Sequence, residues 1–155
     1  MPARAKVLTV SDRTAAGERP DASGPAVADL LAEHGFEVVE RRVVADGLGP
    51  VGEALRALTA GFVGLVVTTG GTGFGPRDLT PEATAAVLER EAPGLAEAMR
   101  AAGPLGPLSR GRAGTVGAAL VLNLPGSPKG ATECLAAVVG LLPHALELLA
   151  GHHPH

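Results

Sequence analysis

Two aspartates about thirty positions apart are the residues of this sequence best suited to chemistry. Asp46 follows an apolar run, and Asp78 closes a glycine-rich segment. If both carboxylates face a phosphate at one edge of a sheet, each unit-charge pair is repelled by about 4 kcal/mol at roughly 4 Å and an effective dielectric of about 20. A cation must then intervene. Mg²⁺ suits this site because it binds through one or two carboxylates together with substrate phosphates. Either Asp, taken singly, also suits a loop or a helix cap.

The glycine-rich segment 70–78 is a candidate anion-binding loop. It is not a P-loop, because Pro76 and Arg77 stand where Lys and Ser/Thr are required, and neither frame fits a dinucleotide fingerprint. Its glycines would let backbone N–H groups approach an anion, and Arg77 could add a planar fork of donors for phosphate. The alternative is a tight turn with a solvated Arg77. The expected contacts in this segment are Gly70, Gly71, Thr72, Gly73, Gly75 and Arg77.

Two earlier segments have both structural and ligand-binding interpretations. Ser11 and Asp12 follow the first apolar run, while Ser23 and Gly24 precede Pro25, which favours a helix beginning there. Such residues are ordinary turn and N-cap signals. Because a helix N-terminus also attracts phosphate, capping and ligand contact are compatible.

Two later segments leave the same alternatives open. Residues 123–129 read Asn-Leu-Pro-Gly-Ser-Pro-Lys, and we expect Asn123, Pro125, Gly126 and Ser127 to contact ligand, although a rigid strand-to-helix turn explains them equally. The Ser-Arg-Gly-Arg sequence at 109–112 could hold anions, but arginines in an exposed loop are usually solvated.

Apolar runs rich in β-branched residues must position these segments. The first three of these runs are spaced by about thirty residues, which is typical of consecutive βαβ units, and stripes at three- and four-residue steps between them predict helices covering a sheet. Right-handed crossovers would place helices on both faces, which gives a three-layer α/β/α sandwich with a mostly parallel central sheet. The carboxyl ends of its strands would gather all the polar segments at one cleft. The predicted strands are Lys6–Val10, Val38–Val44, Leu65–Thr69 and Ala119–Leu124.

The second half of the sequence contains several patterns that predict helices. Thr80 as N-cap with Pro81 behind it predicts a helix to about Arg90. A short helix is expected over 93–102, a loop over 103–114, and a final apolar stripe from Leu135 to Leu149 whose helix is kinked or restarted near Pro143.

Composition narrows the class of protein. The 155 residues suit one domain, 1–151, with residues 152–155 as a flexible tail whose histidines could also catch a metal. A net charge of −3 and three aromatic residues disfavour nucleic acid as a partner. The opening residues lack a signal peptide, and no run approaches 18 uninterrupted apolar residues, so we expect a cytoplasmic protein away from membranes. The single cysteine, Cys134, excludes an internal disulfide and is expected in the core.

Several motifs together, from about Lys6 to Leu149, resemble the MogA/MoaB family of molybdenum cofactor biosynthesis. They are Ser11-Asp12-Arg13, Asp21-x-Ser23-Gly24, Gly70-Gly71-Thr72-Gly73, Arg77-Asp78-x-Thr80-Pro81-Glu82-Ala83, Ser109-Arg110-Gly111 and Asn123 through Pro128. The resemblance implies a molybdopterin-binding fold, commonly trimeric and in some relatives hexameric. It implies Mg²⁺-dependent transfer of AMP from ATP to the terminal phosphate of molybdopterin, with release of pyrophosphate, and a molybdenum-insertion protein as a possible partner. The family's acidic, metal-holding pair maps to Asp46 and Asp78.

One position departs from this pattern and leaves alternatives open. Gly47 follows Asp46 where many relatives have a second acidic residue, so the number of metal ions is unsettled. MoaB-like members share the same features, and a noncatalytic pterin-binding or scaffolding protein of the same pathway is therefore the rival hypothesis. A nucleotide- or anion-binding module unrelated to pterin is a third.

Overall fold

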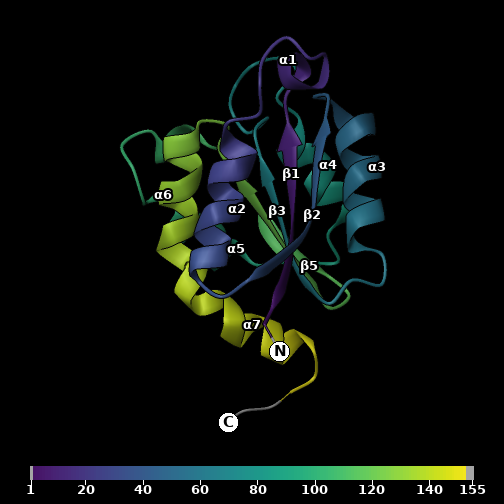
Figure 1. The fold of residues 1–155 in the computed structure, drawn as a ribbon, viewed down its shortest axis with the longest axis vertical. Coiled ribbons are helices and arrows are strands. Elements are labelled where there is room, and N and C mark those ends of the chain that lie inside the picture. Colours follow the sequence, from purple (N-terminus) through teal and green to yellow (C-terminus); the bar gives the residue numbers. More distant parts are fainter. Residues whose placement is uncertain (1, 153–155) are drawn as a thin grey trace.

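The computed structural model describes residues 2–152, which form a six-stranded sheet between two layers of helices (Figure 1). The strand order is β2-β1-β3-β6-β5-β4, in which β2, β1, β3 and β6 run parallel and β5 and β4 are antiparallel additions. The predicted α/β/α sandwich with a mostly parallel sheet is confirmed. The strands are β1 (Arg4–Val10), β2 (Glu37–Val44), β3 (Gly64–Thr69), β4 (Arg90–Glu91), β5 (Ala113–Val116) and β6 (Ala119–Leu124).

The helices divide between the two faces of the sheet. On one face α2, α5, α6 and α7 cover a core that includes Leu65 and Leu122, and on the other α3 and α4 cover Leu8 and Val66. Alternate side chains of β3 thus enter opposite cores, and every residue of β3 is buried, as expected of a central parallel strand. The helices are α1 (Asp12–Ala15), α2 (Ser23–Glu33), α3 (Leu48–Thr59), α4 (Thr80–Val87), α5 (Pro93–Arg100), α6 (Pro128–Val138) and α7 (Leu142–Leu149).

The chain changes direction across the sheet at β1. From β1 it passes through α2 to β2 on one side, then through α3 to β3 on the other side of β1. A crevice opens at the carboxyl ends of such a strand pair, where ligands bind in open α/β sheets. Gly70, directly after β3, lies so close to β1 that a Cβ there would be 2.1 Å from the Val10 carbonyl oxygen. A side chain at residue 70 would therefore force the two strand ends apart.

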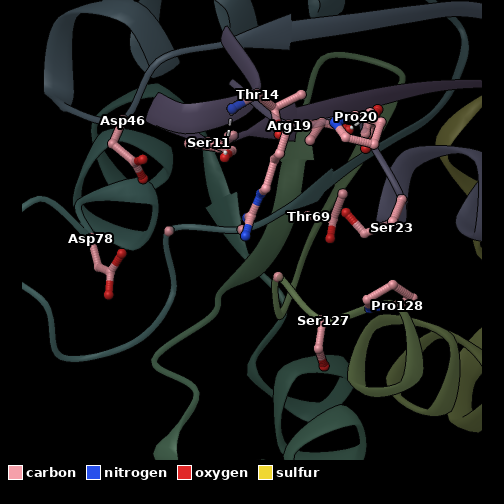
Figure 2. A pocket seen from close by; sticks show the side chains of 17 residues that line it. Ser11, Thr14, Arg19, Pro20, Ser23, Asp46, Thr69, Asp78, Ser127 and Pro128 are labelled. Atoms are coloured by element: carbon pink, nitrogen blue, oxygen red, sulfur yellow. Dashed lines mark hydrogen bonds between the residues drawn. The ribbon is translucent and has the colours of Figure 1, made fainter. Parts of the chain in front are cut away.

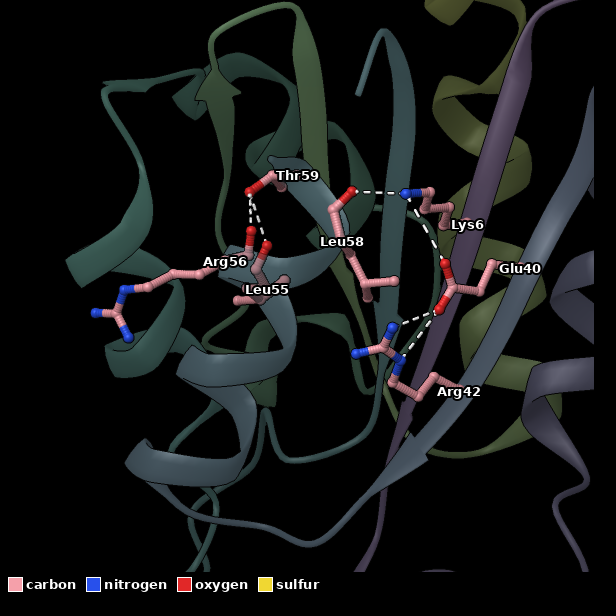
Figure 3. Close-up of polar contacts among 7 residues, drawn as sticks. All are labelled: Lys6, Glu40, Arg42, Leu55, Arg56, Leu58 and Thr59. Carbon is pink, nitrogen blue, oxygen red and sulfur yellow. Dashed lines mark hydrogen bonds and ion pairs between the residues drawn. The ribbon is translucent and has the colours of Figure 1, made fainter. Parts of the chain in front are cut away.

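A lysine in β1 fixes α3 and the edge strand β2 relative to each other (Figure 3). Lys6 Nζ donates a hydrogen bond of 3.0 Å to the Leu58 carbonyl in the last turn of α3 and lies 3.8 Å from the Glu40 carboxylate of β2. The ammonium group also lies 4.2 Å from the ring centroid of Phe62. Cations suit helix C-termini, where carbonyl groups lack helical partners. α3 begins at Leu48, two residues after Asp46, and the Lys6 contacts hold its opposite end.

Three sequence predictions for residues 80–116 are corrected. The helix expected to reach about Arg90 ends at Val87, because Glu89 N donates to the Thr115 carbonyl at 2.8 Å and so draws the chain into β4. The region predicted as loop, 103–114, contains a 3₁₀ turn at Gly106–Leu108 and the start of β5. Thr80 is also not an N-cap: it is the first helical residue, Leu79 precedes it, and no side chain caps the helix.

The C-terminal helix is interrupted as predicted. Between α6 and α7 lies a 3₁₀ turn, Val139–Leu141, and Pro143 stands in the first turn of α7. The run Pro128–Leu149 is long and apolar enough, by length and composition, to cross a membrane. Its buried side chains, including Leu135 and Leu142, belong to the core beside the sheet, so packing within this fold accounts for its composition. The predicted flexible tail concerns residues 152–155, of which 153–155 lie outside the described residues.

Candidate active site

A cavity of about 670 Å³ lies at the carboxyl ends of β1 and β3 (Figure 2). It is bounded by the segments that follow β1, β2, β3 and β6, so the predicted convergence of four loops is observed. The predicted site residues that line it are Ser11, Ser23, Asp46, Gly70, Gly71, Asp78, Gly126 and Ser127. Those that do not form its wall are Asp12, Gly24, Thr72, Gly73, Gly75, Arg77, Asn123 and Pro125.

Asp46 and Asp78 lie on the same side of the cavity (Figure 2). Asp46 Oδ2 accepts a hydrogen bond of 2.9 Å from the backbone N–H of Asp12. Asp78 Oδ2 accepts one of 2.9 Å from the N–H of Gly75. In each carboxylate the other oxygen, Oδ1, has no hydrogen-bond donor among the described residues. The pair therefore presents two carboxylate oxygens available to a cation.

Asp12 joins three of the converging loops instead of lining the cavity. Its backbone N–H donates to Asp46 Oδ2, and its Oδ1 accepts from the backbone N–H of Asp46 at 3.2 Å, so the two residues bond reciprocally. Arg77 holds the outer side of the same carboxylate at 2.5 and 3.0 Å, and donates to the Asp46 carbonyl at 2.9 Å. The phosphate-binding fork expected of Arg77 is thus occupied by protein groups, and its role here is to fix Asp12 and Asp46.

The pKa values of these carboxyl groups reflect their surroundings. Burial raises the pKa of Asp46, and the negative charges of Asp12 and Asp78 raise it further, against the opposing hydrogen bond from Asp12. The hydrogen bonds from Arg77 lower the pKa of Asp12. A cation bound here would offset the repulsion between the carboxylate of Asp46 and its negatively charged neighbours.

The donor set at this pair fits Mg²⁺. Among residues 2–152 no group of three or more His, Cys, Asp or Glu side chains gathers as a protein cage for a metal. Two carboxylate oxygens, with substrate phosphates and waters completing the shell, is the arrangement that Mg²⁺ commonly adopts. Asp46 and Asp78 would hold the ion.

The glycine-rich segment is ordered from outside by Arg110. The guanidinium of Arg110 donates to the carbonyls of Gly73 and Asp78 at 2.8 and 2.6 Å, and to Glu82 at 2.6 Å, while its backbone N–H donates to the Thr72 carbonyl. The 109–112 sequence, left open between anion binding and solvation, therefore supplies a clamp across both ends of the 73–78 loop. This clamp holds the backbone of Asp78.

The prediction of consecutive free N–H groups in that segment is wrong at two positions. Gly70 N donates to the Leu124 carbonyl at 3.1 Å, which continues the pairing of β3 with β6, and Gly75 N is taken by Asp78. The glycines instead permit close packing. A Cβ on Gly71, whose φ is +69°, would lie 2.2 Å from Thr80 Oγ1.

Asn123, expected to contact ligand, is an interior residue. It is 2% exposed, and its amide group donates to the hydroxyls of Thr68 and Thr84 at 3.0 Å and accepts from Arg112 N at 3.0 Å. Buried amides require such partners. Asn123 is the fifth residue of β6, where strand alternation turns it into the protein.

Two helix starts form the wall opposite the aspartates. Ser127 caps α6, accepting from Gly130 N at 3.0 Å, and α2 begins at Ser23. The cap-like bond in α2 comes from Asp21, whose Oδ1 accepts from Gly24 N at 2.9 Å. Helix N-termini favour phosphate groups, so this wall complements an anion.

Sequence reasoning missed several wall residues. Thr9, Thr14, Arg19, Pro20 and Thr69 line the cavity. Thr9 is the penultimate residue of β1, and Thr69 is the last residue of β3. Their positions at the carboxyl ends of predicted strands were a usable signal. Arg19 lies in the irregular segment between α1 and α2, where sequence alone does not indicate the direction of a side chain.

Known proteins are similar to this chain in both sequence and fold. The family described as a probable molybdopterin binding domain matches residues 6–144. This chain belongs to that molybdopterin-binding domain family. The molybdopterin adenylyltransferase of Helicobacter pylori is 39% identical over 154 residues, which cover 95% of this chain and 88% of that protein.

Two further relatives extend the comparison. The crystal structure of MoaB from Thermus thermophilus, described as a molybdopterin biosynthesis enzyme, superposes with a TM-score of 0.90 and 50% identity over 96% of this chain and 97% of that one. The molybdenum cofactor biosynthesis bifunctional protein of Synechococcus elongatus is 39% identical over 151 residues, 95% of this chain but 47% of that protein. The resemblance to the MogA/MoaB family drawn from the motifs is confirmed.

Replacement of Gly71 by Ala should destabilise this molybdopterin-binding domain. Positive φ and the contact with Thr80 both oppose a Cβ there, so we expect Gly71→Ala to lower the free energy of unfolding by about 1–3 kcal/mol. Urea denaturation measures the change. Gly94→Ala is the matched control, because Gly94 lies in α5 with open space around its Cβ position, and it should be neutral or stabilising. Equal stability of the two variants would contradict the close packing of Gly71.

Proposed function

We propose that this protein is a molybdopterin adenylyltransferase, transferring AMP from ATP to molybdopterin. The observation that carries the proposal is the Asp46–Asp78 pair, with two available carboxylate oxygens beside a cavity lined by helix starts that suit phosphate. The similarity to the Helicobacter pylori adenylyltransferase over nearly the whole chain supports the reaction class.

The proposed reaction needs no protein nucleophile. An oxygen of the molybdopterin phosphate attacks the α-phosphorus of ATP, the bond from that phosphorus to the oxygen bridging the β-phosphate breaks, and pyrophosphate leaves. Positioning and neutralisation of charge then carry the catalysis. Mg²⁺, when bound, would neutralise the charge of the triphosphate during transfer.

Individual residues have distinct parts in this proposal. Asp46 and Asp78 hold the ion, and Asp12 with Arg77 keeps Asp46 in place. Ser23 and Ser127, at the starts of α2 and α6, face the phosphate groups from the opposite wall. Arg110 fixes the loop that carries Asp78.

Direct assay tests the proposed activity. Purified protein incubated with molybdopterin, ATP and Mg²⁺ should form adenylylated molybdopterin and pyrophosphate, both detected by mass spectrometry, and chelation of the metal should abolish the product. Tight pterin binding without AMP transfer, even in excess Mg²⁺, would support instead a noncatalytic MoaB-like binding or scaffolding protein.

Substitution of Asp78 by Asn separates a metal-holding residue from a turn residue. Asn retains an oxygen to accept the Gly75 N–H, so the turn and the melting temperature should persist, while the charge is lost. We expect turnover to fall about 10²–10³-fold with little change in pterin affinity, by analogy with loss of one preorganised electrostatic group. Asp29→Asn, an exposed residue of α2 outside the cavity, is the control and should keep full turnover. Turnover within a few-fold of wild type together with a lowered melting temperature would make Asp78 structural.

We further propose a cytoplasmic trimer or dimer of trimers, as the MogA/MoaB resemblance implies. Exposed apolar side chains such as Phe74, 73% accessible, supply surface for self-association. Sedimentation velocity at micromolar concentrations should show a trimer or hexamer. A monomer throughout that range would refute the assembly and leave the proposed chemistry untouched. A molybdenum-insertion protein is the proposed partner, in keeping with the larger, bifunctional relative.

A further inference from the structure

The side chain of Arg19 enters the cavity from the segment between α1 and α2. Figure 2 shows it extending away from that segment, with Asp46 and Asp78 on one side of its guanidinium group and Thr69 on the other. The segment is anchored at both ends: Glu18 N donates to the Arg13 carbonyl, and Asp21 accepts from Thr9 Oγ1 at 2.8 Å. The position of Arg19 at the cavity is therefore set by the fold around it.

Arg19 is the one cationic side chain among the residues that line the cavity. The ionisable side chains of the wall are otherwise Asp21, Asp46 and Asp78. Asp21 is engaged by Thr9 and Gly24 and lies 3.9 Å from Arg41. Within residues 2–152 the Arg19 guanidinium makes no hydrogen bond and no ion pair. Arg19 is an exposed residue, and its five N–H donors are consequently available at the wall of the cavity.

Other arginines near the cavity are used differently. Arg77 is held by Asp12, and Arg110 by Glu82 and two loop carbonyls. Arg13, the second residue of α1, lies 3.9 Å from the carboxylate of Glu18. These side chains stabilise the protein itself. Arg19 alone of the four combines a place in the cavity wall with donors that no described residue uses.

We propose that Arg19 binds a phosphate group of the molecule that occupies this cavity, an inference that rests on the proposed adenylyl transfer and names a further residue for it. A guanidinium group pairs with phosphate through two parallel hydrogen bonds. Arg19 would supply positive charge from the α1–α2 side, while the cation held by Asp46 and Asp78 supplies it from the other. The phosphate belongs either to ATP or to molybdopterin.

Binding measurements on charge variants test this inference without requiring turnover. Wild type, Arg19→Gln, Arg19→Lys and Arg13→Gln are titrated calorimetrically, in Mg²⁺, with ATP, pyrophosphate, molybdopterin and the uncharged probe adenosine. We expect Arg19→Gln to weaken phosphate-bearing probes about 10–100-fold, since charge-assisted hydrogen bonds are lost, and to leave adenosine unaffected. Arg19→Lys, which keeps charge but not the fork, should be intermediate, and Arg13→Gln should match wild type. Unchanged melting temperatures establish that each variant is folded.

The probes distinguish the two sources of phosphate. Weakening confined to ATP and pyrophosphate assigns Arg19 to the nucleotide, and weakening confined to molybdopterin assigns it to the pterin. Wild-type affinities in Arg19→Gln, or no binding of any phosphate by wild type, would overturn the inference. If phosphate binding depends on Arg19 but no AMP is transferred, the inference stands and the adenylyltransferase proposal fails.

Discussion

The reciprocal hydrogen bonding between Asp12 and Asp46 is the interaction on which the site depends. These residues follow β1 and β2, strands that are neighbours in the sheet but separated by the whole of α2 in the chain. Arg77, from the segment after β3, closes the same unit. The segments that follow three different strands are thus joined by hydrogen bonds. The carboxylate of Asp46 is oriented by the backbone N–H of Asp12, which the fold holds in place. Without these hydrogen bonds the strand ends would still lie side by side, but the carboxylates of Asp12 and Asp46 would not be fixed relative to each other.

That arrangement concentrates negative charge, which needs compensation. Asp12 is matched by Arg77 outside the cavity, whereas within residues 2–152 neither Asp46 nor Asp78 forms an ion pair. The pKa of Asp46 is raised because burial and the nearby negative charges both disfavour its ionised form. A site of this kind favours ligands that bring positive charge together with phosphate, such as a metal-bound nucleotide. The unmatched carboxylates are therefore better explained by ligand binding than by stability.

The central architecture was predictable because its signals are local. β3 and β6 are almost continuous apolar or β-branched runs, β1 and β2 are rich in such residues although charged residues interrupt them, and β6 was predicted with its observed bounds. β5 was missed because its four residues, Ala-Gly-Thr-Val, become a strand only by pairing with β6. Asn123 was misassigned by its motif, although it stands within an apolar strand that is buried on both faces. The direction of Arg19 depends on tertiary anchoring of its segment, which no local pattern encodes.

The clamp made by Arg110 has an evolutionary consequence. The loop that carries Asp78 takes its shape from a side chain donated by another part of the chain, through bonds to main-chain carbonyls at residues 73 and 78. Carbonyl groups are common to every amino acid, so this contact depends on the backbone at residues 73 and 78 and not on the exposed side chain of Phe74 between them. Phe74 is therefore free to differ among descendants without disturbing the backbone of Asp78, whereas Arg77 in the same loop is constrained by its contacts with Asp12 and Asp46.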